Sequence, residues 1–178
     1  MQPKFECHTH VVSRRHALKM TLLGGRAIIG GLAVTAPARA GGGAEALLLS
    51  CMDYRLVDDI VRYMDGRQLT NNYDHVVLAG AALGATSDKF PGWNATFWEH
   101  LDVAIKLHHI KKVIVLDHRD CGAYRIVLDK NLTGDEEKAA HAEQMNTLAT
   151  AITKKYPDLA VELLLMGLDG AVEPIAMG

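Results

Sequence analysis

Short apolar runs alternate with amphipathic stretches along this chain from residue 46 onward. The apolar runs cover residues 46–50, 75–78, 113–117 and 159–166, and the amphipathic stretches cover residues 56–64, 96–109 and 135–156. Parallel strands that are covered by helices on both faces have no polar face, so they form short continuous apolar runs. We therefore predict an α/β fold, a single domain with a roughly four-stranded parallel sheet flanked by helices.

Local signals mark the ends of some of these elements. Gly134 is followed by three acidic residues, which favour the start of a helix because they meet the positive end of its dipole. Pro157 is expected to end that helix. The dipeptide Pro91-Gly92 is expected to lie in a loop.

Charge divides the chain at about residue 40. Residues 1–40 carry six Lys and Arg side chains and one acid, a charge of +5, which leaves −7 on residues 41–178 because the whole chain has a formal charge of −2. Nucleic-acid binding requires a basic face, so we expect no nucleic-acid partner for the acidic part. That part is long enough for one hydrophobic core.

The basic leader is typical of an export signal. The segment Ser13-Arg14-Arg15-His16-Ala17-Leu18-Lys19 precedes a weakly apolar stretch and then Ala38-Arg39-Ala40, a small-x-small cleavage pattern. The paired arginines resemble a twin-arginine signal, which predicts export to the bacterial periplasm and domain boundaries at 1–40 and 41–178. The alternative is an amphipathic N-terminal arm that packs on a partner subunit.

The leader is not expected to anchor the protein in a membrane or to bind metal. Its uninterrupted apolar segment, residues 27–36, is far shorter than the ~20 residues that span a bilayer. Cys7, His8 and His10 are potential metal ligands, but they lie in the part that export would remove. We therefore expect no permanent membrane anchor and no functional metal site in residues 1–40.

Metal-binding side chains follow two of the predicted strands. Cys51 comes directly after the first apolar run, and His118 and Cys121 follow the third. The carboxyl ends of parallel strands form a ligand crevice where the strand order switches, so we expect these side chains to converge. Three sulfur and nitrogen donors fit Zn²⁺ and leave its fourth position open, as catalytic zinc requires.

A structural disulfide is the alternative for these cysteines. Cys51 and Cys121 are the only cysteines after residue 40, and an oxidising compartment permits a disulfide. His118, together with Asp53 and Arg55 at matching positions, favours the metal site.

Two motifs in this chain resemble the paired signatures of the β-carbonic anhydrases. These are Cys-x-Asp-x-Arg, formed by Cys51, Asp53 and Arg55, and His-x-x-Cys-Gly, formed by residues 118–122. The residues of both motifs, Cys-Met-Asp-x-Arg-Leu and His-x-Asp-Cys-Gly, are similar to those of the small clade whose relatives include carbonyl sulfide and carbon disulfide hydrolases. The segment Gly167-Leu168-Asp169-Gly170 resembles the closing strand and turn of the family, and the resemblance covers residues 46–175.

This resemblance implies a zinc hydro-lyase, a carbonate dehydratase. Zinc would lower the pKa of its bound water toward 7 and generate the hydroxide that hydrates CO₂ reversibly to bicarbonate. Asp53 and Arg55 would be catalytic: Asp53 accepts a hydrogen bond from the zinc-bound water or takes the fourth metal position itself, and Arg55 clamps it. The family also implies a homodimer or larger assembly. An ordinary surface ion pair is the alternative for Asp53 and Arg55.

The sequence departs from the family pattern around the substrate pocket. Val77-Leu78-Ala79-Gly80-Ala81 stands where the family has an Arg-Asn-Ala-Gly type of segment. Residues 87–99 contain four aromatic side chains, which either line an apolar entrance to the metal or pack at a subunit interface. These departures keep two alternatives open: a carbonyl sulfide or carbon disulfide hydrolase on the same zinc site, and a non-catalytic zinc-binding homologue closed by Asp53.

Some polar residues near the motifs have no assigned role. Arg119 and Asp120 either tune the metal through its ligands or are exposed loop charges, and we leave them out of the catalytic set. Imidazole titrates near neutral pH, so five histidines are candidate proton shuttles, although each also fits a solvated or capping role: His75, His100, His108, His109 and His141.

Overall fold

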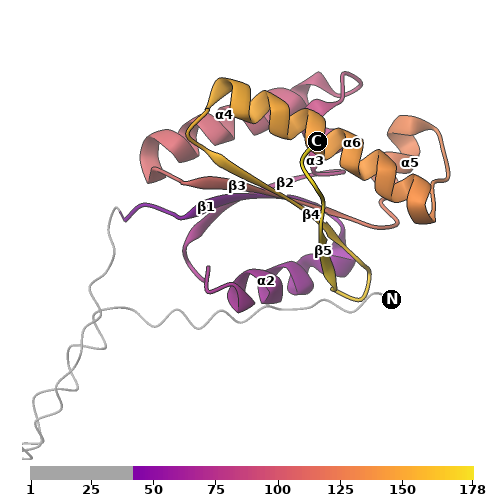
Figure 1. Ribbon diagram of the computed structural model, residues 1–178, viewed down its shortest axis with the longest axis horizontal. Coiled ribbons are helices and arrows are strands. Elements are labelled where there is room, and N and C mark those ends of the chain that lie inside the picture. The colour runs from indigo at the N-terminus through magenta and orange to yellow at the C-terminus, as the bar shows by residue number, and fades with distance from the viewer. Residues whose placement is uncertain (1–41) are drawn as a thin grey trace, which may run out of the picture. The chain divides into compact units, whose positions relative to one another are not determined.

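A five-stranded sheet forms the centre of the computed structural model, which describes residues 42–178 (Figure 1). The strand order is β2-β1-β3-β4-β5, in which the first four strands are parallel and β5 is antiparallel to β4. The strands are β1 (Ala46–Cys51), β2 (Tyr73–Leu78), β3 (Lys112–His118), β4 (Ala160–Met166) and β5 (Val172–Pro174). The α/β fold and its four parallel strands were predicted and are confirmed, and β5 is an addition.

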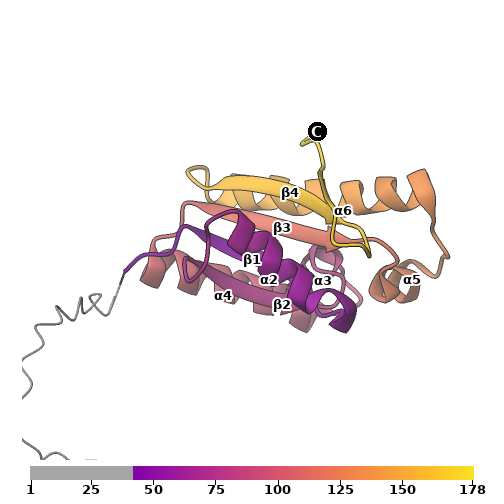
Figure 2. The ribbon, with the colours of Figure 1, turned by 90° about the horizontal axis from the view of Figure 1, so that it is seen from below.

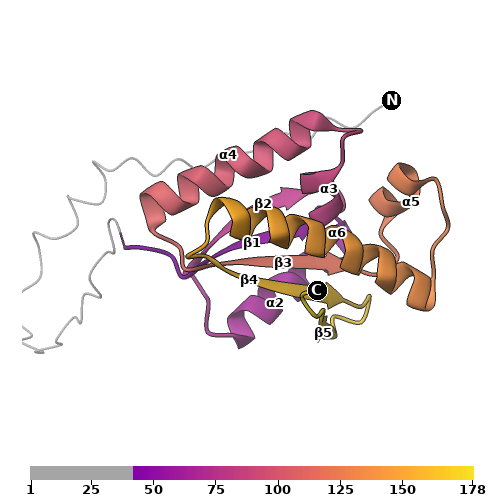
Figure 3. The ribbon, with the colours of Figure 1, turned by 45° about the horizontal axis from the view of Figure 1, so that its top comes forward.

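Helices cover both faces of this sheet. Figure 2 shows α2 (Val57–Gly66) on one face, and Figures 1 and 3 show the longer helices on the other. The second face carries α3 (Ala82–Thr86), α4 (Pro91–His108) and α6 (Gly134–Lys155), with α5 (Gly122–Leu128) near the ends of the strands. A short 3-10 turn, η1 (Tyr54–Leu56), leads from β1 into α2.

The pleat of the strands divides the core into two layers. Leu47 and Leu49 of β1 pack with Phe97 of α4 and with apolar residues of α6, while Leu48 packs with Met64 of α2. Successive side chains of a strand point to opposite faces, so a strand covered on both faces must be apolar at every position. This is the physical reason why the strands were visible as continuous apolar runs.

The expectation that Pro91-Gly92 lies in a loop is wrong. Pro91 is the first residue of α4, five residues before the predicted start at residue 96. Proline is tolerated in the first turn of a helix, because its missing N–H would have no partner there and its fixed φ suits the helix. Helices α3 and α5 were not predicted, because five and seven residues are too few for a periodic signal.

The basic leader, with Arg14, Arg15, Cys7, His8 and His10, lies outside the described residues, so export and the boundary at residue 40 stay predictions. Within residues 42–178, no helix is both long enough and apolar enough to cross a bilayer.

Candidate metal centre

Cys51, His118 and Cys121 meet where β1 and β3 end side by side. Cys51 is the last residue of β1, His118 is the last residue of β3, and Cys121 caps the N-terminus of α5. The chain passes from β1 to β2 on one side and continues to β3 on the other, so the strand order switches between β1 and β3. The three side chains thus lie in the crevice expected at such a switch.

The three donor atoms are close enough to share one metal ion. They all lie within 4.8 Å of one another, and all three residues are buried. The Sγ atoms of Cys51 and Cys121 are 3.9 Å apart, and both cysteines are free, so the structure does not contain the alternative disulfide. A group of this composition could hold a metal ion and suits zinc.

The imidazole of His118 is oriented as a metal ligand. Its Nδ1–H donates to the carbonyl oxygen of Arg119 at 2.8 Å, a bond that fixes the tautomer and leaves the lone pair on Nε2. Nε2 is buried and has no hydrogen-bond partner among the described residues. A buried nitrogen without a partner is costly, and a bound metal ion would satisfy it.

The two thiols and the imidazole influence one another electrostatically. The hydrogen bond from Cys121 lowers the pKa of Cys51, and the backbone N–H of Gly80, 3.3 Å from the Cys51 sulfur, lowers it further. The same thiol–thiol bond, with burial, raises the pKa of Cys121. Burial by itself would lower the pKa of His118, but the adjacent Cys51 raises it overall. The two cysteines together therefore lose one proton easily, and a bound divalent cation would favour the loss of the second thiol proton.

Asp53 and Arg55 form a bridge between the two motifs. The carboxylate of Asp53 accepts hydrogen bonds from the backbone N–H of Arg55 at 3.0 Å and from its Nε and Nη2 at 3.0 and 2.7 Å. Arg55 also donates through Nη1 to the Asp120 carboxylate at 2.8 Å and through Nη2 to the Asp120 carbonyl oxygen at 3.0 Å. The guanidinium therefore joins η1, directly after β1, to the turn after β3.

Asp53 lies beside the three donors but is directed toward Arg55. Its Oδ2 is 3.8 Å from Nε2 of His118, and the carboxylate is outside the group of three donors. The hydrogen bonds from Arg55 lower the pKa of Asp53 to about 2, so Asp53 is ionised at neutral pH. The catalytic role of Asp53 and its possible role as fourth ligand both stay predictions.

Arg119 and Asp120, which the sequence left without a role, hold the turn between His118 and Cys121 in place. The N–H of Asp120 donates to Glu137 of α6 at 2.5 Å, and Arg119 pairs with Glu173 of β5 at 2.6 Å. Asp120 has a positive φ of 57°, which aspartate tolerates better than most residues. These partners are 17 and 54 residues away in the chain, so no sequence pattern indicated them.

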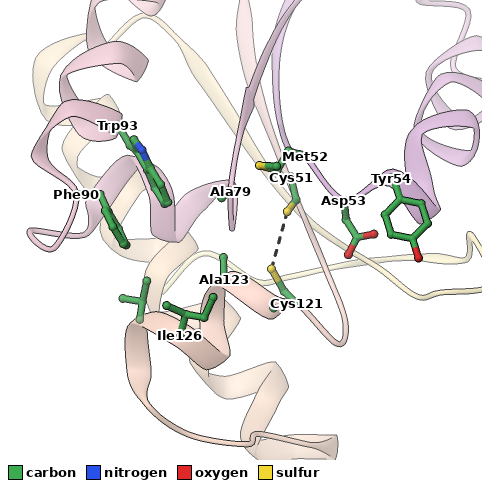
Figure 4. A pocket seen from close by; sticks show the side chains of 12 residues that line it. Cys51, Met52, Asp53, Tyr54, Ala79, Phe90, Trp93, Cys121, Ala123 and Ile126 are labelled. Atoms are coloured by element: carbon green, nitrogen blue, oxygen red, sulfur yellow. Dashed lines mark hydrogen bonds between the residues drawn. The ribbon is translucent and has the colours of Figure 1, made fainter.

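An apolar cavity of about 320 Å³ opens beside the metal centre (Figure 4). Among residues 42–178, Asp53 is the only charged residue that lines it, at the same end as Cys51 and Cys121. Phe90 and Trp93 line it farther away and stack with ring centroids 4.0 Å apart. The remaining lining residues are Met52, Tyr54, Ala79, Gly122, Ala123, Ile126 and Val127.

The cavity is lined by part of each segment that departs from the family pattern. Within residues 87–99, Phe90 and Trp93 line the cavity, whereas Phe97 is completely buried in the core. Ala79, which matches the alanine of the family pattern, lines the cavity, whereas Val77 and Leu78, which stand where the family has Arg and Asn, do not. None of the five candidate proton-shuttle histidines lines the cavity. His75 hydrogen-bonds Ser50, His100 hydrogen-bonds the carbonyl oxygen of Thr96, and His108 pairs with Asp74. His109 is the C-cap residue of α4, and His141 is buried.

Comparison with known proteins gives matches over the described domain. Residues 43–176 match the family model "Putative carbonic anhydrase". An uncharacterized protein of Rickettsia conorii is 42% identical over 134 residues, which are 74% of this chain and 72% of that protein. An uncharacterized protein of Rickettsia bellii is 40% identical over 134 residues, 74% of this chain and 82% of that protein.

Solved structures with the same fold are distant in sequence. A carbonic anhydrase from Glaciozyma antarctica has a TM-score of 0.52 at 16% identity and covers 79% of this chain and 87% of its own. β-Carbonic anhydrase isoform I from Trichomonas vaginalis has a TM-score of 0.52 at 15% identity, and the match covers 78% of this chain and 86% of that chain. A tetrameric β-carbonic anhydrase from Sordaria macrospora has a TM-score of 0.51 at 11% identity, and the match covers 76% of this chain and 82% of that chain. These likenesses show the fold.

Proposed function

This chain belongs to the "Putative carbonic anhydrase" family, and from that premise we propose that it is a zinc enzyme that hydrates carbon dioxide reversibly to bicarbonate. Cys51, His118 and Cys121 would hold the zinc ion. One observation carries the proposal: two buried cysteine sulfurs and a buried imidazole nitrogen without a hydrogen-bond partner lie within 4.8 Å of one another. Three ligands leave one position for water or substrate, as in catalytic zinc sites.

Zinc, when bound, supplies a Lewis acid that makes water a nucleophile at neutral pH. Asp53 accepts a hydrogen bond from the attacking water, because its lowered pKa keeps the carboxylate ionised. Arg55 holds that carboxylate through Nε and Nη2 and so fixes which lone pairs face the water.

The apolar cavity delivers a neutral substrate to this centre. Phe90, Trp93 and Ile126 provide a surface that has no strong affinity for bicarbonate, while carbon dioxide has no charge to desolvate. A site that binds the uncharged substrate weakly and repels the charged product by Asp53 favours product release.

The same cavity favours a second candidate, the hydrolysis of carbonyl sulfide or carbon disulfide. The cavity of about 320 Å³ is lined mostly by apolar side chains. Sulfur is larger and less polar than oxygen, so a wide apolar pocket accommodates these analogues. Sulfide released from either gas would select this reaction over the hydration of carbon dioxide.

The deciding experiment combines metal analysis with a stopped-flow assay of CO₂ hydration on the full chain. We expect one zinc ion per chain and rapid acidification. Cys51→Ser should lose both, whereas Cys7→Ser, the same substitution in the leader, should keep both. Zinc without hydration of CO₂ and without sulfide release would identify a non-catalytic zinc protein, and absence of zinc would contradict the proposal.

We further propose that the protein is a homodimer or a larger homo-oligomer. Met52, Tyr54 and Ile126 are large apolar side chains at the cavity that are 66, 86 and 71% exposed, which suits coverage by a second subunit. Sedimentation analysis tests the assembly, and a monomer at micromolar concentration would refute it. Export by the twin-arginine route is tested separately, by whether Arg14→Lys with Arg15→Lys abolishes periplasmic delivery.

A further inference from the structure

Asp117 is a buried carboxylate directly before the proposed ligand His118. Its residue is 1% exposed, and its side chain lies on the sheet face that carries α3 and α6. Three donors surround it: the backbone N–H of Ala82 at 3.0 Å, the hydroxyl of Tyr124 at 2.6 Å and Nδ1 of His141 at 2.7 Å. No sequence pattern singled out Asp117, because it occupies the end of an apolar run.

The first donor connects Asp117 to Cys51. Ala82 begins α3 directly after Gly80 and Ala81, whose φ values of 75° and 40° are both positive. Such a conformation at an alanine is strained and persists only where the surroundings hold it. The strained turn places the N–H of Gly80 3.3 Å from the Cys51 sulfur, and the bond from Ala82 to Asp117 fixes its far end.

The second donor connects Asp117 to Cys121. Tyr124 lies in the first turn of α5, three residues after Cys121, and is 3% exposed. Its hydroxyl bond to Asp117 sets how α5 approaches β3 and therefore where the cap residue Cys121 lies. Burial and the charge of Asp117 raise the pKa of Tyr124 well above its ordinary value, so the hydroxyl keeps the proton that it donates.

The third donor connects Asp117 to α6. His141 is 1% exposed and packs its ring 3.8 Å, centroid to centroid, from the ring of Tyr124. The same helix supplies Glu137, which accepts from the N–H of Asp120 in the turn between His118 and Cys121. Helices α3, α5 and α6 lie together near the carboxyl end of β3 (Figure 3).

We infer that Asp117 is a positioning residue for the metal centre: its carboxylate, directly before His118 on β3, ties together α5, which follows Cys121, α6, and α3, whose preceding turn bonds Cys51. The inference rests on the proposed zinc site. A buried carboxylate is expensive to desolvate, and an apolar side chain of similar volume usually packs as well or better. Asp117 therefore contributes geometry rather than stability alone, as hydrogen-bonding partners behind metal ligands do elsewhere.

The test compares isosteric variants of the full chain. Asp117→Asn turns one acceptor oxygen into a donor, and Tyr124→Phe removes one hydroxyl. We measure zinc affinity by chelator competition and the visible absorption spectrum of the Co²⁺-substituted protein. Asp117→Asn should weaken zinc binding by about 10–100-fold and alter the Co²⁺ spectrum, and Tyr124→Phe should act in the same direction by a smaller factor.

Leu148→Ala is the matched control, because Leu148 is a completely buried residue of α6 outside these contacts. It should lower the melting temperature without changing zinc affinity or the Co²⁺ spectrum. Wild-type affinity and spectrum in both Asp117→Asn and Tyr124→Phe would overturn the inference, whatever the melting temperature. If Asp117→Asn does not fold, Tyr124→Phe decides. A wild-type chain that binds no zinc overturns the proposed function as well, whereas a zinc-loaded chain without hydratase activity overturns only that function.

Discussion

Replacing Arg55 by alanine tests the bridge between the two motifs. Arg55 donates to Asp53 at 3.0 and 2.7 Å and to Asp120 at 2.8 Å, so Arg55→Ala removes side-chain hydrogen bonds from both carboxylates at once. The pKa of Asp53, now about 2, should return toward the ordinary value of about 3.9. A shift of one unit corresponds to about 1.4 kcal/mol, which gives about 2.6 kcal/mol before any correction for solvent.

Solvent screening reduces the contribution of this pKa shift to the free energy of unfolding. The side chain of Arg55 is 33% exposed and that of Asp53 is 15% exposed, and partly exposed ion pairs are screened, so we expect a loss of about 1 kcal/mol at pH 7. For a domain of this size that is a fall in melting temperature of about 3 °C. The sign with pH follows from linkage: a carboxyl whose pKa is lower in the folded protein stabilises above the unfolded pKa of about 3.9. The difference between wild type and variant should therefore shrink as pH falls from about 4 through 2.

The assays are thermal unfolding of the metal-free protein between pH 2 and 7, a carboxyl NMR titration of Asp53, and stopped-flow hydration of CO₂ by the zinc-loaded protein. Loss of orientation of Asp53 should lower kcat by about 100-fold. Arg55→Lys keeps the charge but cannot donate to Asp53 and Asp120 in the planar geometry of a guanidinium, so its kcat should lie between those of wild type and Arg55→Ala. Arg62→Ala, which breaks the exposed Arg62–Asp59 pair, is the control and should leave kcat unchanged. A pKa of about 2 for Asp53 in Arg55→Ala, or a wild-type kcat, would refute the reasoning.

Three further substitutions, one of them with a matched control, test the surroundings of the centre and the core. Gly80→Ala puts a side chain at φ 75° and 3.1 Å from the Cβ of Ala123, so it should lower stability by about 1–2 kcal/mol in a melting experiment. Gly66→Ala has open space and should be neutral or stabilising by about 0.5 kcal/mol; equal effects would contradict the strain argument. Phe97→Ala empties a completely buried position and should cost about 3–5 kcal/mol in urea unfolding, and a cost below 1 kcal/mol would contradict its place in the core. Trp93→Ala should raise KM for CO₂ roughly 10-fold at constant kcat, because an apolar wall contributes uniform binding, and a selective loss of kcat would contradict that role.

The sequence predicted the features that depend on neighbouring residues, together with one long-range feature that follows from the parallel sheet those residues indicate. The apolar runs predicted the four parallel strands because β1 and β3 are buried on both faces, and β2 and β4 are buried over part of their length. Cys51, His118 and Cys121 were predicted to converge because the carboxyl ends of parallel strands share one edge, and the structure brings them together. Short helices such as α3 and α5 carry too few residues for a periodic pattern and were missed.

Contacts between segments far apart in the chain were decided only by the tertiary structure. Asp120 accepts a hydrogen bond from Arg55, which is 65 residues away in the chain, and Asp117 accepts one from Ala82, which is 35 residues away. Phe90 and Trp93 were only candidates for lining a pocket until α4 was placed against the metal centre. The sequence by itself determined which atoms can bind a metal, because donor chemistry belongs to the residue. How those atoms are held, and which apolar side chains face them, follows from packing that no local pattern encodes.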